Sequence, residues 1–260
     1  MDNRLQLPDP DIAIEIPDLA VVPLRNSILK MQSFSSILAQ QRLAPELWEW
    51  RRFEYQHFYS AWVGIAFRFR ACAEHSQAFS VLFERSRGDT NGLELYQEDE
   101  AIYGFFVKGL SALECFYYGL YALGALICTP TDRLSVLPHP EFPLLTPFDD
   151  KRLKLIVPKV TKEVIARCFP NSSLSVMIDL ILKSAEYSSW SDIRNILAHR
   201  IGTVGRSMQM DLHNRPFAVR SWAGNILFTA DLTSSYYAWL CQTLNAGLVA
   251  VDAFVTEHLN

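Results

Sequence analysis

The sequence predicts an all-α fold, a bundle of long helices with a small β insertion before the last helix. Apolar residues recur with helical spacing over two stretches of roughly 35 to 40 residues each. Glycine is scarce, with 11 among 260 residues, which suits long helices better than a turn-rich β fold. Hydrophobic residues make up 50% of the chain, so it can bury a sizeable core and is not expected to be disordered.

The chain is expected to have two parts, an N-terminal segment at 1–44 and a helical domain at 45–260. Prolines recur in the first 24 residues, which favours an extended arm with one edge strand. A short helix should follow over 28–42, capped by Asn26 or Ser27. The first residues lack the pattern of a signal peptide.

The helical domain is expected to open with two long helices. The first should begin at Pro45, because proline suits the first helical position, and should end near Gly88. The second should run over 93–128, since a Thr-Pro pair follows it. Its stretch 109–128 is as long and apolar as a membrane span. Glu114 lies inside that stretch, so we expect a buried core helix and no membrane insertion.

Shorter elements should fill the remainder of the domain. The proline-rich stretch 129–150 predicts an irregular connection. After Gly202 the pattern changes to short alternating runs, which predicts a β insertion over 203–230. A last long helix, capped by Asp231 or Thr233, should end near His258. The expected intermediate helices are 159–168 and 173–187, and the expected strands are 208–212, 217–222 and 226–229.

The stretch from Ser191 to Arg200 concentrates polar groups that can do chemistry. Its apolar residues have helical spacing, so it should be a helix with one face in a core. A serine at 188, 189 or 191 is the expected N-cap, which places these polar groups at the start of the helix. Asn195 and His199 are four residues apart and therefore share a helix face. The long side chain of Arg194 can curl toward that histidine.

The order Arg194-Asn195-x3-His199 resembles the signature of the HEPN superfamily, in which an arginine and a following polar residue precede a histidine. At the level of architecture the resemblance covers roughly 45–128 and 173–258, and it is specific only at 192–200. It implies a bundle of four or five helices. Many HEPN proteins are metal-independent endoribonucleases, so the resemblance implies this activity.

RNA can be cleaved without a metal when its own 2′-hydroxyl attacks the adjacent phosphate. Histidine can move the protons and a guanidinium can bind the phosphate. The resemblance implies His199 as acid or base and Arg194 as the phosphate ligand, with no cofactor. Asn195 would either hold the orientation of the histidine ring or contact the phosphate. One histidine cannot be base and acid in the same step. HEPN nucleases meet this need by dimerising, so a homodimer with a shared two-fold site is expected.

Charges near the motif are consistent with a phosphate substrate. The chain has a net charge of −4, but the stretch 194–222 contains five arginines and a single acid. Candidate RNA contacts are Arg206, Arg215 and Arg220, although a solvated surface explains them equally well. Candidate supporting residues are Asp192, Arg200 and Glu114. The first two are also explained as a helix-start acid and a surface base, and Glu114 by a structural ion pair.

Five widely spaced cysteines predict reduced, buried thiols in a cytoplasmic protein. The pairs Glu54-x-x-His57 and Cys72-x-x-His75 each lack the second half of a metal site, so no metal is expected there. The resemblance further implies a toxin or antiviral defence effector that acts on RNA and has a neutralising protein or enzyme partner. The alternative is a non-catalytic HEPN-like module for binding or dimerisation.

Overall fold

The computed structural model describes residues 45–85, 92–128, 141–145, 150–199, 204–210, 216–221 and 227–258. The protein is mostly helical, as the sequence predicts. The expectations for the arm at 1–44 and for most of the 129–150 connection lie outside the described residues. The chain divides into two compact units. Unit 1 comprises the described residues of 45–66, 114–181 and 244–258, and unit 2 those of 67–113 and 182–243.

Three long helices contribute residues to both units: α2 (Pro45–Arg85), α3 (Gly92–Cys128) and α8 (Ala230–His258). The expected start of the first helix and the expected end of the second are confirmed. The start of α8 differs from the prediction, because the Thr229 hydroxyl caps it by accepting a hydrogen bond from the backbone N–H of Leu232 at 3.1 Å. Asp231 and Thr233 lie inside the first turn.

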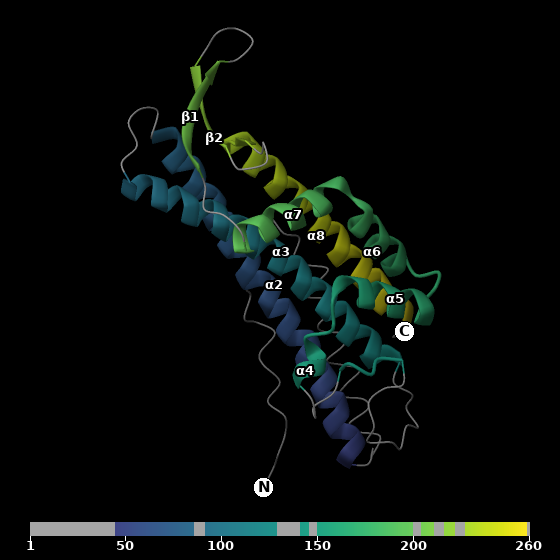
Figure 1. Cartoon of the computed structure of the whole chain (residues 1–260). Coiled ribbons are helices and arrows are strands. Elements are labelled where there is room, and N and C mark those ends of the chain that lie inside the picture. Colours follow the sequence, from purple (N-terminus) through teal and green to yellow (C-terminus); the bar gives the residue numbers. More distant parts are fainter. Residues whose placement is uncertain are drawn as a thin grey trace. The chain divides into compact units, whose positions relative to one another are not determined.

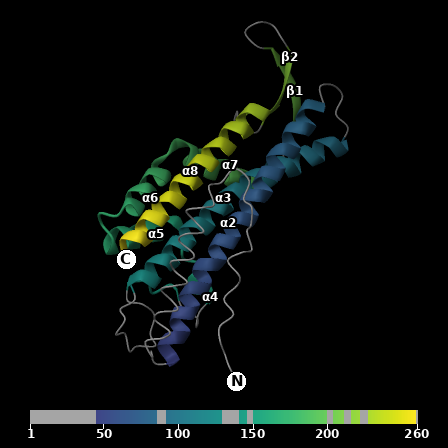
Figure 2. The ribbon, with the colours of Figure 1, turned by 180° about the vertical axis from the view of Figure 1, so that it is seen from behind.

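Unit 1 contains the C-terminal part of α3 together with α4 (Asp150–Leu153), α5 (Pro158–Cys168) and most of α6 (Ser173–Lys183). α5 and α6 lie beside the C-terminal part of α8 (Figures 1 and 2). Aromatic rings fill the interior, and the Trp62 and Phe116 rings meet edge to face with centroids 5.9 Å apart.

Unit 2 adds α7 (Ala185–His199) and a three-stranded antiparallel sheet to its parts of α2, α3 and α8. The strands β1 (Val204–Met210), β2 (Pro216–Ser221) and β3 (Leu227–Phe228) pair in the order β1-β2-β3. β1 and β2 lie near the N-terminal end of α8 (Figures 1 and 2).

The predicted boundary between the helix at 173–187 and the motif helix is wrong. α6 ends at Lys183 and α7 begins at Ala185. The cause is Ser184, whose hydroxyl accepts a hydrogen bond from the backbone N–H of Tyr187 at 3.1 Å and so caps α7. The motif residues consequently lie in the C-terminal half of α7, and His199 is its last residue.

Two of the described helices are long and apolar enough to cross a membrane, α3 and α8. Within α3, 72% of the apolar window is buried inside the protein, as expected for a core helix, against 44% for α8. Glu114 is exposed despite its apolar helix, so its charge does not require a buried partner.

Candidate functional site

Trp190 fixes α7 in unit 2. Its indole is fully buried and donates a hydrogen bond to the backbone oxygen of Phe106 at 2.8 Å. The ring stacks on Phe105 with centroids 5.1 Å apart and meets the Tyr236 ring edge to face at 5.3 Å. Gly109 makes the close approach of α3 possible, because a Cβ there would lie 2.1 Å from the indole Cζ2. These contacts fix the part of α7 that immediately precedes Arg194.

Arg194 and Asn195 are in direct contact on α7. The Arg194 Nη1 donates a hydrogen bond to the Asn195 Oδ1 at 3.1 Å. Asn195 is exposed and Arg194 is partly buried, whereas Ile193 between Asp192 and Arg194 faces the core. The exposed positions 188, 192 and 195 follow one helix face at spacings of three or four residues.

His199 occupies the next position of that spacing, four residues after Asn195, but its side chain lies outside the described part of the structure. Arg200 and Arg215 also lie outside it. The structure therefore brings Arg194 and Asn195 together and gives the position of His199 on the backbone.

Arg206 and Arg220 are direct cross-strand partners between β1 and β2. Arg220 also pairs across β2 and β3 with Phe228, a fully buried residue whose ring meets Phe106 edge to face at 5.7 Å.

The other predicted supporting residues are both exposed. Asp192 lies in the middle of α7, so it is not the helix-start acid that the sequence predicted. Glu114 belongs to unit 1, and the motif residues belong to unit 2.

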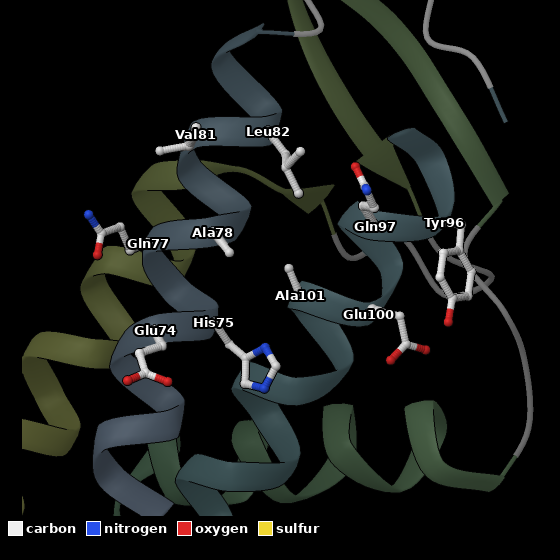
Figure 3. A pocket seen from close by; sticks show the side chains of 10 residues that line it. All are labelled: Glu74, His75, Gln77, Ala78, Val81, Leu82, Tyr96, Gln97, Glu100 and Ala101. Carbon is white, nitrogen blue, oxygen red and sulfur yellow. The ribbon is translucent and has the colours of Figure 1, made fainter. Parts of the chain in front are cut away.

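A groove of about 610 Å³ runs between α2 and α3 within unit 2. Ala78 and Ala101 face each other across it, and His75 lies between the two helices (Figure 3). Its two charged lining residues, Glu74 and Glu100, are both acidic and exposed. An acidic lining repels phosphate, so this groove is not a site for an RNA backbone.

His75 packs its imidazole directly on the backbone of α3. A Cβ at Gly104 would lie 2.4 Å from the ring, so only glycine leaves room for it. Burial lowers the pKa of His75, and the positive charge of Lys108 lowers it further, against opposing effects of Glu74 and Glu100. The ring is therefore neutral at pH 7 and serves as a packing group.

The described residues contain no group of three or more His, Cys, Asp or Glu that could hold a metal ion. His57, one half of the Glu54-x-x-His57 pair, has its Nδ1 hydrogen-bonded to the Tyr118 hydroxyl. Glu54 is almost fully buried. The pair is thus part of the packing of unit 1.

Comparison with models of protein families, with curated proteins and with solved structures finds no match to this chain. The candidate site thus depends on the residues themselves. Trp190 and Gly109 are the residues that the sequence analysis missed. In the sequence they are an aromatic residue and a glycine on two separate helices. Only their contact in the folded protein shows that they belong together.

Proposed function

We propose that the protein is a metal-independent endoribonuclease that cleaves RNA by attack of the 2′-hydroxyl on the adjacent phosphate. The observation that supports this most is the contact of Arg194 with Asn195 on an exposed face, one turn before His199. The buried Trp190 holds the helix that carries them. Catalytic groups on a rigid element need little reorganisation during the reaction.

In this proposal Arg194 binds the scissile phosphate. A guanidinium suits this role because it is always charged and carries five N–H donors in a planar fork, and in Arg194 Nη1 donates to Asn195. Asn195 accepts that bond through Oδ1, so its amide N–H groups can still donate to phosphate oxygens. His199 moves the proton.

The complete reaction needs a second proton-transfer group, because the attacking hydroxyl loses a proton while the leaving 5′-oxygen gains one. A second copy of the chain supplies it in our proposal, with two motif helices facing one phosphate. Arg206 and Arg220 extend the positive charge along the sheet, with Arg200 and Arg215 nearby in sequence. We place this activity in a cytoplasmic toxin or defence effector with a neutralising partner.

The test uses purified full-length protein with RNA in excess EDTA. Products should carry 2′,3′-cyclic phosphate and 5′-hydroxyl ends, which distinguishes this chemistry from metal-dependent hydrolysis. His199→Ala and Arg194→Ala should each lower the rate by at least about 100-fold. Arg194→Lys should also be weak, because lysine lacks the fork geometry.

Ser188→Ala serves as the matched control, since it changes an exposed position on the same face of α7 one turn before Asp192. Its rate and its helical content should equal those of the wild type. The proposal is abandoned if pure protein leaves all RNA intact, or if the His199 and Arg194 variants cut at the wild-type rate.

A non-catalytic binding module is the second candidate, and exposed apolar side chains on α3 favour it. Leu93, Tyr96 and Tyr103 are 65%, 60% and 41% exposed, and they recur along one helix within unit 2. Such a patch is typical of a surface that binds a protein partner. Loss of binding or self-association in Tyr96→Ser/Tyr103→Ser, together with absent RNA cleavage in the wild type, would favour this function.

A further inference from the structure

α3 and α5 of unit 1 meet along a series of contacts that ends at two cysteines. The Thr161 hydroxyl donates a hydrogen bond to the backbone oxygen of Tyr117 at 3.3 Å. One to two turns later, a Cβ on Gly124 would lie 2.8 Å from the Ile165 Cδ1, so the two helices are in close contact there. From these contacts both helices continue toward their C-terminal ends, where Cys128 is the last residue of α3 and Cys168 the last residue of α5.

The two thiols are close enough for each to affect the pKa of the other, and both cysteines are partly exposed. Neighbouring segments hold this arrangement in place. The Phe142 ring meets the Tyr121 ring edge to face at 5.1 Å, and the Arg167 Nε pairs with the Glu141 Oε2 at 2.8 Å. All five cysteines of the chain are thiols in the structure.

We propose that Cys128 and Cys168 are a redox modification site, which a hydroperoxide converts to an intramolecular disulfide joining the C-terminal ends of α3 and α5. The Cys168 thiolate attacks one peroxide oxygen, the O–O bond breaks, and a sulfenic acid and water form after protonation. Cys128 then attacks the sulfenic sulfur and displaces a second water. Two thiols and one hydrogen peroxide thus give one disulfide and two waters.

Electrostatics decide which thiol reacts first and how fast. Burial raises the pKa of Cys128 to about 12, with further contributions from Cys168, Glu141 and the buried Glu54. Burial and Glu141 also raise the pKa of Cys168, but Arg167 opposes them through its charge and a hydrogen bond. Cys168 is therefore the better nucleophile, and both thiols stay protonated at neutral pH.

The test treats the full-length protein with hydrogen peroxide, blocks the remaining thiols and maps disulfides by mass spectrometry. We expect the Cys128–Cys168 bond, with reversal by a thiol reductant. It closes a loop of about 40 residues, so the oxidised protein should melt about 5–10 °C higher than the reduced protein.

Two variants identify the order of attack. With Cys128→Ser, a 1,3-diketone probe should trap a sulfenic acid at Cys168. With Cys168→Ser, the same probe should label Cys128 far less. Cys115→Ser is the matched control, because Cys115 is also a partly exposed thiol on α3 and its loss should leave the disulfide unchanged.

The rate of oxidation gives a second readout that does not depend on how a cysteine variant folds. It should rise roughly tenfold per pH unit between pH 7 and 9, because the thiolate is the reacting form. Glu141→Gln should speed the reaction and Arg167→Gln should slow it. The proposal is overturned if peroxide produces only other disulfides or none, or if Glu141→Gln and Arg167→Gln leave the rate unchanged.

Discussion

Gly109→Ala should destabilise the protein through a single contact. A Cβ at this position would lie 2.1 Å from Cζ2 and 2.8 Å from Cη2 of Trp190, closer than unbonded atoms can come. The indole must move, which costs about 1–3 kcal/mol as overpacking. Movement also breaks the bond of the indole N–H to the Phe106 oxygen, and a buried unpaired donor costs about 1–3 kcal/mol.

One effect opposes this loss, because alanine favours a helix interior over glycine by about 1 kcal/mol. The net expectation is a loss of about 2–4 kcal/mol in the free energy of unfolding, measured by urea titration with far-UV circular dichroism. Gly92→Ala is the control, since its Cβ would meet nothing within 4 Å. Its free energy of unfolding should change little.

A double-mutant cycle isolates the contact. Phenylalanine at position 190 lacks the six-membered indole ring that carries Cζ2 and Cη2, so Gly109→Ala should cost less in a Trp190→Phe background, by at least about 1 kcal/mol. Equal costs in both backgrounds would refute the steric explanation. An unchanged or increased stability of Gly109→Ala alone would refute it as well.

Three further changes test other features. Lys108→Gln should raise the low pKa of His75, seen as an upward shift of its midpoint in an NMR titration, since the lysine charge helps to keep the ring neutral. Burial raises the pKa of Tyr121 to about 12 from an ordinary value of 10, so ionisation favours the unfolded chain as pH rises above 10. About 2 kcal/mol should be lost by pH 12 in urea titrations, and Tyr121→Phe should remove this part of the loss. Arg206→Gln should weaken RNA binding and lower its salt dependence, because it removes one positive charge from β1. Unchanged RNA affinity and salt dependence would argue against a phosphate-binding role for this residue.

The long helices were predictable because their signals are local and repeated. Pro45 marks the start of α2 by its own backbone geometry. The apolar residues of α3 recur every three or four positions along the whole helix. The boundary between α6 and α7 at Ser184 was not predictable from such local signals. Several serines between 184 and 191 can each cap a helix, and the choice depends on which of them the tertiary contacts of Trp190 allow.

The candidate site was predictable only as a pattern. The sequence identified Arg194, Asn195 and His199, and the structure adds the contact of the first two and their place in the C-terminal half of α7. The burial of Trp190 against Gly109 joins residues far apart in sequence, so no local signal predicts it. The exposure of Glu114 likewise depends on which face of α3 its neighbours cover.

The sharing of α2, α3 and α8 between the two units has a consequence for how the protein can be dissected. Because each unit is assembled from several separate segments, neither can be produced by cutting the chain at one linker. Tryptophans offer another way to observe the units separately, with Trp62 in unit 1 and Trp190 and Trp239 in unit 2. Fluorescence of variants that keep only one of these residues would report whether both units lose their structure in one transition.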